Sequence, residues 1–271
     1  MKKWMTIVIA ILAVLALTIP AVAEENARPN ITAHKAVGIV IDGNLGEWNL
    51  DSPAVVEDAS QLIKDAHMWK GADDLSVKFY LAWDEENLYI AADVTENTPL
   101  GAIEMLPIDG EDNMILYIST DPAADPERET YGINDFMIYF VMDEGAWSTA
   151  VDRSMLPKDV MKSVRYKSIG MDGGESVLPG YECAVEMTVT GFTWEAVLPW
   201  SALSMENTLQ DKKCSLERYT PTAGDVLGVD FSITDIDYPC PGTEYIPEMA
   251  WTGNIKIKAS PLQWGTVTLG D

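Results

Sequence analysis

The chain has 271 residues, of which 47% are hydrophobic and 23% charged, and its formal net charge is −25. The apolar fraction is ample for a buried core, which excludes an intrinsically disordered chain, and the length suits one all-β domain. The acidic excess argues against nucleic acids, anionic lipid heads and acidic polysaccharides as partners, because binding to polyanions depends on Lys and Arg.

The chain begins with the pattern of a secretory signal peptide. Lys2 and Lys3 precede an apolar run from Met5 to Leu17, and Ala21-Val22-Ala23 supplies the small residues that a signal peptidase requires. The run is shorter than the roughly 20 residues that span a bilayer, which favours cleavage after Ala23 over a retained anchor. We therefore predict a signal peptide at residues 1–23, no membrane span in the mature chain, and a secreted, periplasmic or cell-surface location. Loss of the two lysines lowers the net charge to −27.

The mature chain consists largely of short runs in which apolar and polar residues alternate, separated by clusters of Asp, Asn, Gly and Pro. This period of two is typical of an antiparallel β-sandwich. Residues 24–36 are expected to form a flexible N-terminal segment, and residues 37–271 a single β-sandwich domain. The clearest pair is a hairpin in which Val77, Phe79 and Leu81 alternate with polar neighbours and lead through a turn to a second run over residues 88–93. The other expected strands are Val37–Ile41, Asn113–Ser119, Asp135–Met142, Val164–Ile169, Tyr181–Thr190, Phe192–Leu198, Val226–Ile233 and Gly265–Leu269.

Helical periodicity is scarce. One short helix is expected after Leu198, where Pro199 suits a first helical turn, and another near Ser60–Ala66. The stretch from Glu206 to Gly224 has a loop-like composition and is interpreted as an insertion between strands.

Three cysteines are present, an odd number for an exported chain. Alternation places Cys183 on the same strand face as Val185, which indicates a buried thiol. Cys214 lies in a charged, loop-like stretch and Cys240 between two prolines. A Cys214–Cys240 disulfide that joins two loops is the favoured pairing in an oxidising compartment.

A set of motifs runs in order along nearly the whole mature chain and resembles family 9 carbohydrate-binding modules. These modules are non-catalytic β-sandwiches that are attached to secreted polysaccharide-degrading enzymes or occur in stand-alone surface proteins. The resemblance implies an all-β antiparallel sandwich of carbohydrate-binding-module type with one or two short helices, no enzyme activity, a neutral poly- or oligosaccharide as ligand and a polysaccharide-degrading enzyme as a possible partner. The motifs are Val40-Ile41-Asp42-Gly43 with Glu47-Trp48, Trp83-Asp84-Glu85-Glu86-Asn87-Leu88-Tyr89-Ile90, Glu111-Asp112, Trp194-Glu195-Ala196-Val197-Leu198-Pro199-Trp200, Gly224-Asp225-Val226-Leu227-Gly228 leading to Asp235, Trp251, and Pro261-Leu262-Gln263-Trp264-Gly265.

The resemblance also implies a slot in which two tryptophans sandwich a terminal sugar while polar side chains bind its hydroxyls. A pyranose face carries C–H bonds that pack on an aromatic plane, and buried hydroxyls need matched partners. Trp251 stands where one tryptophan is expected, and Glu111-Asp112 belongs to the motif beside the slot. Residues 105–110 hold no tryptophan where the second one is expected, and residues 135–139 hold no Arg or Lys where the sugar binders carry a basic residue. Trp69 and Trp147 are the candidates for a relocated second plane.

Calcium is the cofactor that the resemblance suggests. Carboxylate oxygens in loops are the hard ligands that Ca²⁺ requires, and extracellular calcium permits weak sites. The candidate ligand pairs are Asp235 and Asp237, Asp121 and Asp125, or Asp93 and Glu96, of which Asp235, Asp237 and Asp93 are the favoured ligands.

Three alternatives to a glycan-binding module follow from the same residues. The missing clamp residues favour a structural or adhesive surface β-sandwich that has lost sugar binding. Related sandwiches bind haem b in periplasmic electron-transfer subunits, and this chain offers Met together with two histidines, His34 and His67. A glycoside hydrolase would use a pair of carboxylates, but acidic residues are too abundant for the sequence to nominate one.

Overall fold

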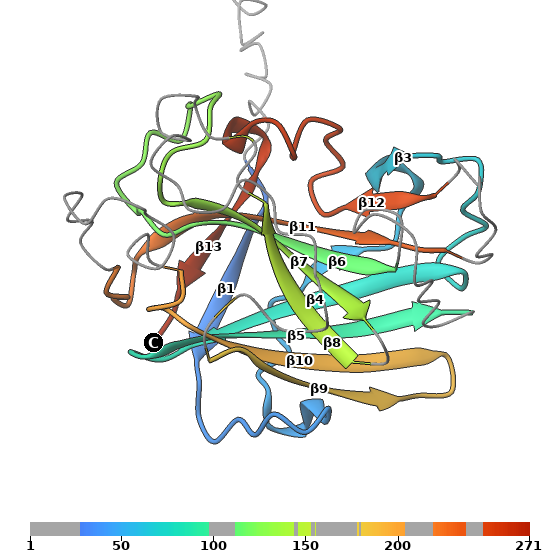
Figure 1. Ribbon diagram of the computed structural model, residues 1–271, viewed down its shortest axis with the longest axis horizontal. Coiled ribbons are helices and arrows are strands. Elements are labelled where there is room, and N and C mark those ends of the chain that lie inside the picture. Colours follow the sequence, from blue (N-terminus) through green and yellow to red (C-terminus); the bar gives the residue numbers. More distant parts are fainter. Residues whose placement is uncertain are drawn as a thin grey trace, which may run out of the picture.

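The chain folds into a β-sandwich in a computed structural model that describes residues 28–97, 112–143, 146–152, 155, 178, 180–203, 219–236 and 246–271. Figure 1 shows two layers of strands, with β6, β7 and β11 above β4, β5, β10 and β9. The predicted signal peptide lies outside the described residues. In the described part of the chain, no helix has the length and apolar character needed to cross a membrane.

Thirteen strands and three short 3-10 turns make up the regular structure of the described residues. The strands are β1 (Asn30–Lys35), β2 (Ala54–Val56), β3 (Leu62–Lys64), β4 (Leu75–Trp83), β5 (Asn87–Glu96), β6 (Asn113–Ser119), β7 (Asp135–Asp143), β8 (Ala146–Asp152), β9 (Glu182–Met187), β10 (Gly191–Pro199), β11 (Val226–Thr234), β12 (Glu248–Ala250) and β13 (Gly265–Leu269). The 3-10 turns are η1 (Leu45–Glu47), η2 (Ala59–Gln61) and η5 (Pro261–Gln263).

Hydrogen bonds connect the strands in the order β8-β7-β6-β11-β13-β1-β4-β5-β10-β9, and β2, β3 and β12 pair outside this path. The first half of the order forms one layer and the second half the other. All described pairs are antiparallel except those of β1, which runs parallel to both of its neighbours. The predicted antiparallel sandwich is therefore confirmed, with one parallel strand at the junction of its layers.

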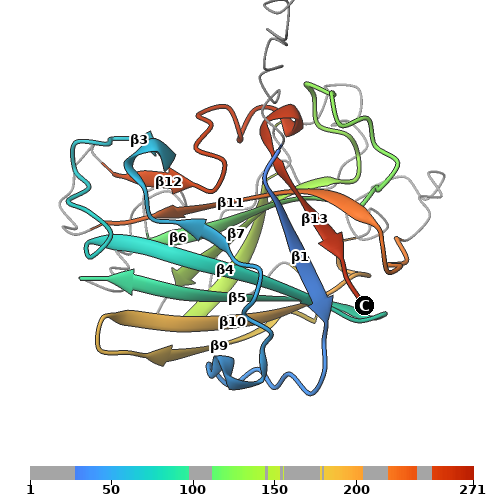
Figure 2. The ribbon, with the colours of Figure 1, turned by 180° about the vertical axis from the view of Figure 1, so that it is seen from behind.

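Strand β1 joins the two layers. Residues 30–33 pair with β13, and His34 and Lys35 pair with β4. Figure 2 shows β1 beside β13 on the near side, crossing from one layer to the other. Because alternate residues of a strand face the same side, Ile31 and Ala33 both enter the core.

The expected strand at Val37–Ile41 is not formed. Val37 is 78% exposed, and Gly38 has a φ of 70°, which ends extended structure there. The strand lies instead at Asn30–Lys35, inside the segment 24–36 for which the sequence predicts flexibility.

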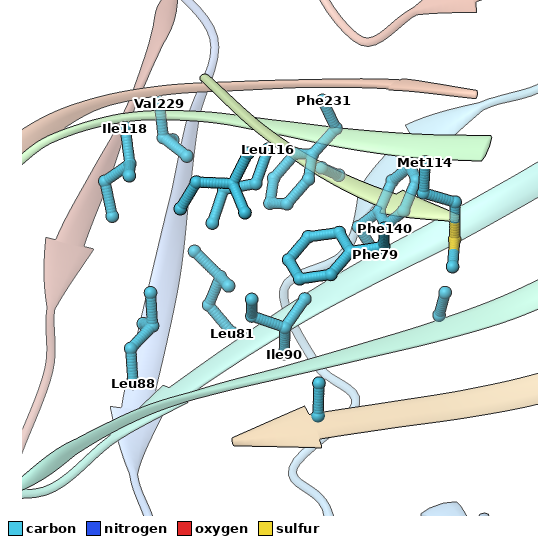
Figure 3. Close-up of a cluster of buried hydrophobic side chains, with 14 of the residues drawn as sticks. Phe79, Leu81, Leu88, Ile90, Met114, Leu116, Ile118, Phe140, Val229 and Phe231 are labelled. Carbon is cyan, nitrogen blue, oxygen red and sulfur yellow. The ribbon is translucent and has the colours of Figure 1, made fainter. Parts of the chain in front are cut away.

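The core lies between the two layers and is built from alternate residues of each strand. Phe79 of β4 stacks on Phe231 of β11 with ring centroids 4.6 Å apart, which ties the layers together at their centre. The alternation predicted for β4 and β5 is confirmed, since Val77, Phe79 and Leu81 all face inward. Figure 3 shows the packing of this cluster, in which Phe79, Leu81, Leu88, Ile90, Met114, Leu116, Ile118, Phe140, Val229 and Phe231 are labelled.

Neither predicted helix forms in the described residues 60–66 and 199–203. After Leu198, the Ala202 N–H donates to the Pro199 carbonyl at 2.8 Å and the Leu203 N–H to the Trp200 carbonyl at 3.2 Å, and residues 200–203 form a turn. At residues 60–66 the chain forms the end of η2 and then β3, whose partner is β12. A pairing of two three-residue strands leaves no periodic signal in the sequence. The expected strand Val164–Ile169 lies outside the described residues.

Glu195 holds the first family-like motif against the sheet. It is fully buried in β10, where one carboxylate oxygen accepts from Trp48 Nε1 and the other from the backbone N–H groups of Asp42 (3.1 Å) and Gly43 (2.6 Å). Burial raises the pKa of Glu195, while these hydrogen bonds act in the opposite direction. The loop at residues 42–48 is therefore fixed by a residue about 150 positions away in the sequence.

Residues 252–264 cover the outer face of the upper layer, where Ile257 and Trp264 belong to a second small core. Trp264 is buried there against Tyr131, with ring centroids 5.3 Å apart in an edge arrangement. Beneath this segment, the buried Asp230 of β11 accepts from the hydroxyl of Thr252 at 2.5 Å and from the Phe231 N–H at 2.8 Å. Burial raises the pKa of Asp230 to about 7.

Candidate metal centre and adjoining cleft

Three carboxylates from separate strand ends meet at one end of the sandwich. Glu96, Asp112 and Asp235 each offer an oxygen within 4.8 Å of the others, and their exposed fractions are 5%, 5% and 2%. In Figure 1 this is the end toward which the arrows of β5 and β11 point. We refer to these three residues as the carboxylate cluster.

Strand pairing brings the three residues together. Asn113 of β6 is the register partner of Thr234 in β11, so the residue before β6 and the residue after β11, Asp112 and Asp235, lie side by side. One oxygen of Asp112 accepts from the Ile236 N–H at 2.6 Å, which fixes that carboxylate. Glu96 ends β5 in the other layer, so the carboxylate cluster spans both sheets.

The donor set of the carboxylate cluster fits a hard divalent cation. Ca²⁺ takes six to eight oxygens, and three carboxylates can provide up to six. A cation between them would offset the cost of burying three acidic groups at close range. Mg²⁺ prefers fewer carboxylates and more water, so this donor set suits Ca²⁺ better.

A cleft of about 390 Å³ opens beside the carboxylate cluster. Its walls are residues 95–97 at the end of β5, residues 188–191 in the turn between β9 and β10, and Asp73. Glu96 belongs to both the cleft and the carboxylate cluster. Acidic and hydroxyl oxygens dominate its polar groups, so the cleft offers many hydrogen-bond acceptors.

The structure corrects the role expected for Trp251. Its side chain is only 9% exposed and packs edge-on against Phe231, with centroids 6.4 Å apart. Its ring lies over Gly265, where an added Cβ would approach the indole to 2.4 Å. Glycine at position 265 thus makes room for the indole, which is a core residue and presents no open plane for a sugar.

The other sugar-site candidates are placed in part. Trp69 is half-buried, packs against the core with one side, and donates through Nε1 to the Leu75 carbonyl at 2.9 Å. Trp147 pairs with Met142 in the edge strand β8, and the position of its side chain is not described. Glu111 lies outside the described residues, and its neighbour Asp112 points into the carboxylate cluster.

Of the predicted metal ligands, one lies in the carboxylate cluster, one lies elsewhere and one is outside the described residues. Asp235 belongs to the carboxylate cluster, whereas Asp93 is exposed on the outer face of β5 and takes no part in it. Asp237 lies outside the described residues. The alternation of β5 distinguishes the acidic residues, because Val94 and Glu96 share the inward face while Asp93 faces out. The alternation of inward and outward residues along β5 is therefore the feature of the sequence that could have identified Glu96 as the inward-facing acidic residue.

The predicted disulfide cannot be placed, since Cys214 and Cys240 both lie outside the described residues. Cys183 is half-buried against the core, and burial raises the pKa of its thiol.

Comparison with known proteins gives one family. The sequence profile described as "Carbohydrate family 9 binding domain-like" matches residues 41–271. Two curated enzymes match at 21% identity: Exoglucanase XynX of Acetivibrio thermocellus over 62% of this chain, and Endo-1,4-beta-xylanase A of Thermoanaerobacterium saccharolyticum over 73%. The matched region spans only 11% and 12% of the length of these enzymes.

Solved structures agree on the fold. A family 9 carbohydrate-binding module from Caldicellulosiruptor kristjanssonii, in complex with cellotriose, superposes with a TM-score of 0.56 at 14% identity. The match covers 89% of this chain and 94% of that structure. At this identity the likeness shows a shared architecture.

Proposed function

Because this chain belongs to the carbohydrate family 9 binding domain-like proteins, a family of non-catalytic modules, we propose that it is an exported module that binds a neutral glycan. The observation that carries the proposal is the family match over residues 41–271, which includes both sheets and the carboxylate cluster. The net charge of −25 supports a neutral rather than an acidic polysaccharide, because like charges repel.

In this proposal Trp69 supplies the aromatic contact to the sugar. The loop that carries Trp69 also carries Asp73, which lines the cleft. The Trp69 indole donates a hydrogen bond to the Leu75 carbonyl, and Leu75 is the strand partner of Glu96. The indole therefore lies at the same end of the sandwich as the carboxylate cluster. Its partly exposed ring can pack against the C–H face of a sugar.

We propose that the carboxylate cluster of Glu96, Asp112 and Asp235 binds calcium as a structural ion. When bound, the cation supplies electrostatic cross-linking between acidic groups. The residues themselves fix the ends of β5, β6 and β11, since each carboxylate adjoins or belongs to one of these strands.

We further propose that the protein is exported after cleavage at Ala23, and that it acts beside a polysaccharide-degrading enzyme. The lysine-rich start and apolar run support export. The names of the two curated relatives, an exoglucanase and a xylanase, support the choice of partner. Mass spectrometry of the mature protein is expected to find a chain that begins at Glu24, and an intact N-terminus would contradict export by this signal.

Isothermal titration with cellotriose and xylotriose at millimolar concentration, with calcium present, tests glycan binding. We expect saturable binding of at least one of the two sugars by the full mature chain. In the same assay, Trp69→Ala is expected to weaken binding about tenfold, the loss of roughly one stacking contact. Absence of binding would instead favour the structural or adhesive sandwich, an alternative that the burial of Trp251 also supports. A Soret band in the absorption spectrum of the purified protein would indicate the haem-binding alternative.

A further inference from the structure

We infer that the cleft between the end of β5 and the β9–β10 turn is the subsite for one neutral sugar residue. The inference rests on the proposed glycan binding and gives that function a location away from Trp251. No family-like motif of the sequence falls on the turn at residues 188–191, which forms one wall of the cleft.

The walls of the cleft are preformed. The Glu96 N–H donates to the Thr190 carbonyl at 2.9 Å, and the Thr188 N–H donates to the Gly191 carbonyl at 2.9 Å, so the turn is fixed to the end of β5. Gly191 permits this close approach, because an added Cβ would lie 2.1 Å from the Val94 carbonyl oxygen. A volume of about 390 Å³ lies within the range of small-ligand sites, and a rigid wall lowers the entropic cost of binding.

The polar groups of the cleft match a ligand rich in hydroxyl donors. Asp73 contributes a carboxylate that can only accept when ionised, and Thr95 and Thr190 contribute hydroxyls that donate or accept. The Glu96 carboxylate is buried in the carboxylate cluster. The lining contains no Lys or Arg among the described residues. Sugar hydroxyls can donate to the Asp73 carboxylate, whereas a uronic acid would bring its own negative charge against it.

One apolar group completes the site. Val189 lies at the tip of the turn, lines the cleft and is fully exposed. An exposed branched side chain at the mouth of a polar cleft offers a contact for the C–H face of a sugar, while the acceptors bind its hydroxyls. The combination of one apolar rim and several acceptors therefore selects a neutral sugar over a small anion.

The inference is tested by titrating the mature chain with cellotriose, xylotriose and trigalacturonic acid in calcium-containing buffer. The cleft variants are Asp73→Ala and Val189→Arg. Their matched controls are Asp93→Ala, an exposed carboxylate on the outer face of β5, and Val37→Arg, an exposed valine in a distant loop. We expect each cleft variant to weaken binding of the neutral sugar about tenfold or more, the controls to bind as the unaltered chain does, and trigalacturonic acid not to bind.

Each other outcome has a distinct meaning. If the unaltered chain binds a neutral sugar and both cleft variants bind it equally well, the cleft is not the subsite, although the module still binds glycans. If trigalacturonic acid binds as tightly as the neutral sugars, the ligand class inferred for the cleft is wrong. If the unaltered chain binds none of the three probes, the proposed function fails and the subsite fails with it.

Discussion

Two groups of buried carboxylates differ in their surroundings, apart from those that pair with Lys or Arg. Glu195 and Asp230 are each surrounded by hydrogen-bond donors from the chain itself, so each has a structural role. Glu96, Asp112 and Asp235 bring three carboxylates close to one another, and Asp112 also accepts from the Ile236 N–H. The first arrangement fixes a loop or a covering segment, and the second provides the oxygens that a cation requires.

Replacement of Glu195 is expected to loosen the loop at residues 42–48. In Glu195→Gln only one oxygen can still accept, so either Trp48 or the N–H pair of Asp42 and Gly43 loses its buried partner. We expect a loss of about 2 kcal/mol in the free energy of unfolding, measured by urea denaturation. Glu186→Gln in the neighbouring strand, at an exposed position, is the control and should unfold like the unaltered chain.

Asp230 predicts a pH dependence of stability. Its folded pKa of about 7 lies above its ordinary value of 3.8, so the folded state binds a proton more tightly than the unfolded state. The contribution to stability is fully present below pH 3.8 and is lost as the pH rises through about 7. Asp230→Asn stays neutral, keeps an acceptor for the Phe231 N–H and can donate to the Thr252 hydroxyl. It should therefore raise the free energy of unfolding at pH 8 by about 4 kcal/mol.

For Asp230→Asn the gain should disappear at pH 4, where the aspartic acid is itself protonated in the fold. An equal effect of the substitution at pH 4 and pH 8 would show that packing, and not ionisation, is responsible.

At the scale of elements, the ends of strands determine the candidate site. Glu96 ends β5, Asp112 precedes β6 and Asp235 follows β11, and the turn after β9 closes the cleft. Regular pairing along each strand fixes the position of its last residue. The acidic side chains at the strand ends of both layers therefore meet in a well-defined arrangement.

Calcium is expected to stabilise this end of the sandwich. Saturating Ca²⁺ should raise the melting temperature by about 5–10 °C relative to protein treated with a chelator, as measured by calorimetry. Asp112→Asn and Asp235→Asn should each abolish most of this shift, because a neutral amide is a weaker ligand. Asp93→Asn should keep the full shift, and a shift that persists in both cluster variants would place the calcium elsewhere.

At the scale of the whole molecule, β1 makes the two layers one folding unit. It pairs with β13 in the upper layer and β4 in the lower, and Ile31 packs in the core between them. The other described strand pairs are antiparallel neighbours within a layer, so a chain without β1 lacks the strand that pairs with both sheets.

A chain that begins at residue 37 is therefore expected to lose cooperative unfolding, whereas one that begins at residue 28 should retain it. Ile31→Ala should cost about 2–4 kcal/mol in the full mature chain, by creating a cavity between the layers. Val37→Ala, at an exposed position, should cost little. Equal thermal melts for the two shortened chains would show that β1 is dispensable.

The sequence by itself determined the sandwich, because burial on one face of a sheet imposes a period of two. Val77, Phe79 and Leu81 carried that period clearly, and β13 was predicted at its observed bounds of Gly265–Leu269. The same rule contained the distinction between Asp93 and Glu96. The family was also accessible from sequence, since its motifs occur in a fixed order along the chain.

Tertiary structure alone decided what depends on distant partners. The burial of Trp251 depends on Gly265 and Phe231, which no local pattern connects to it. Strands such as β3 and β12 are too short to carry a period: β12 forms by pairing with β11, and β3 forms by pairing with β12. The carboxylate cluster and the cleft likewise arise where strand ends from two layers meet, so their geometry follows from the register of the sheets and not from any segment's own composition.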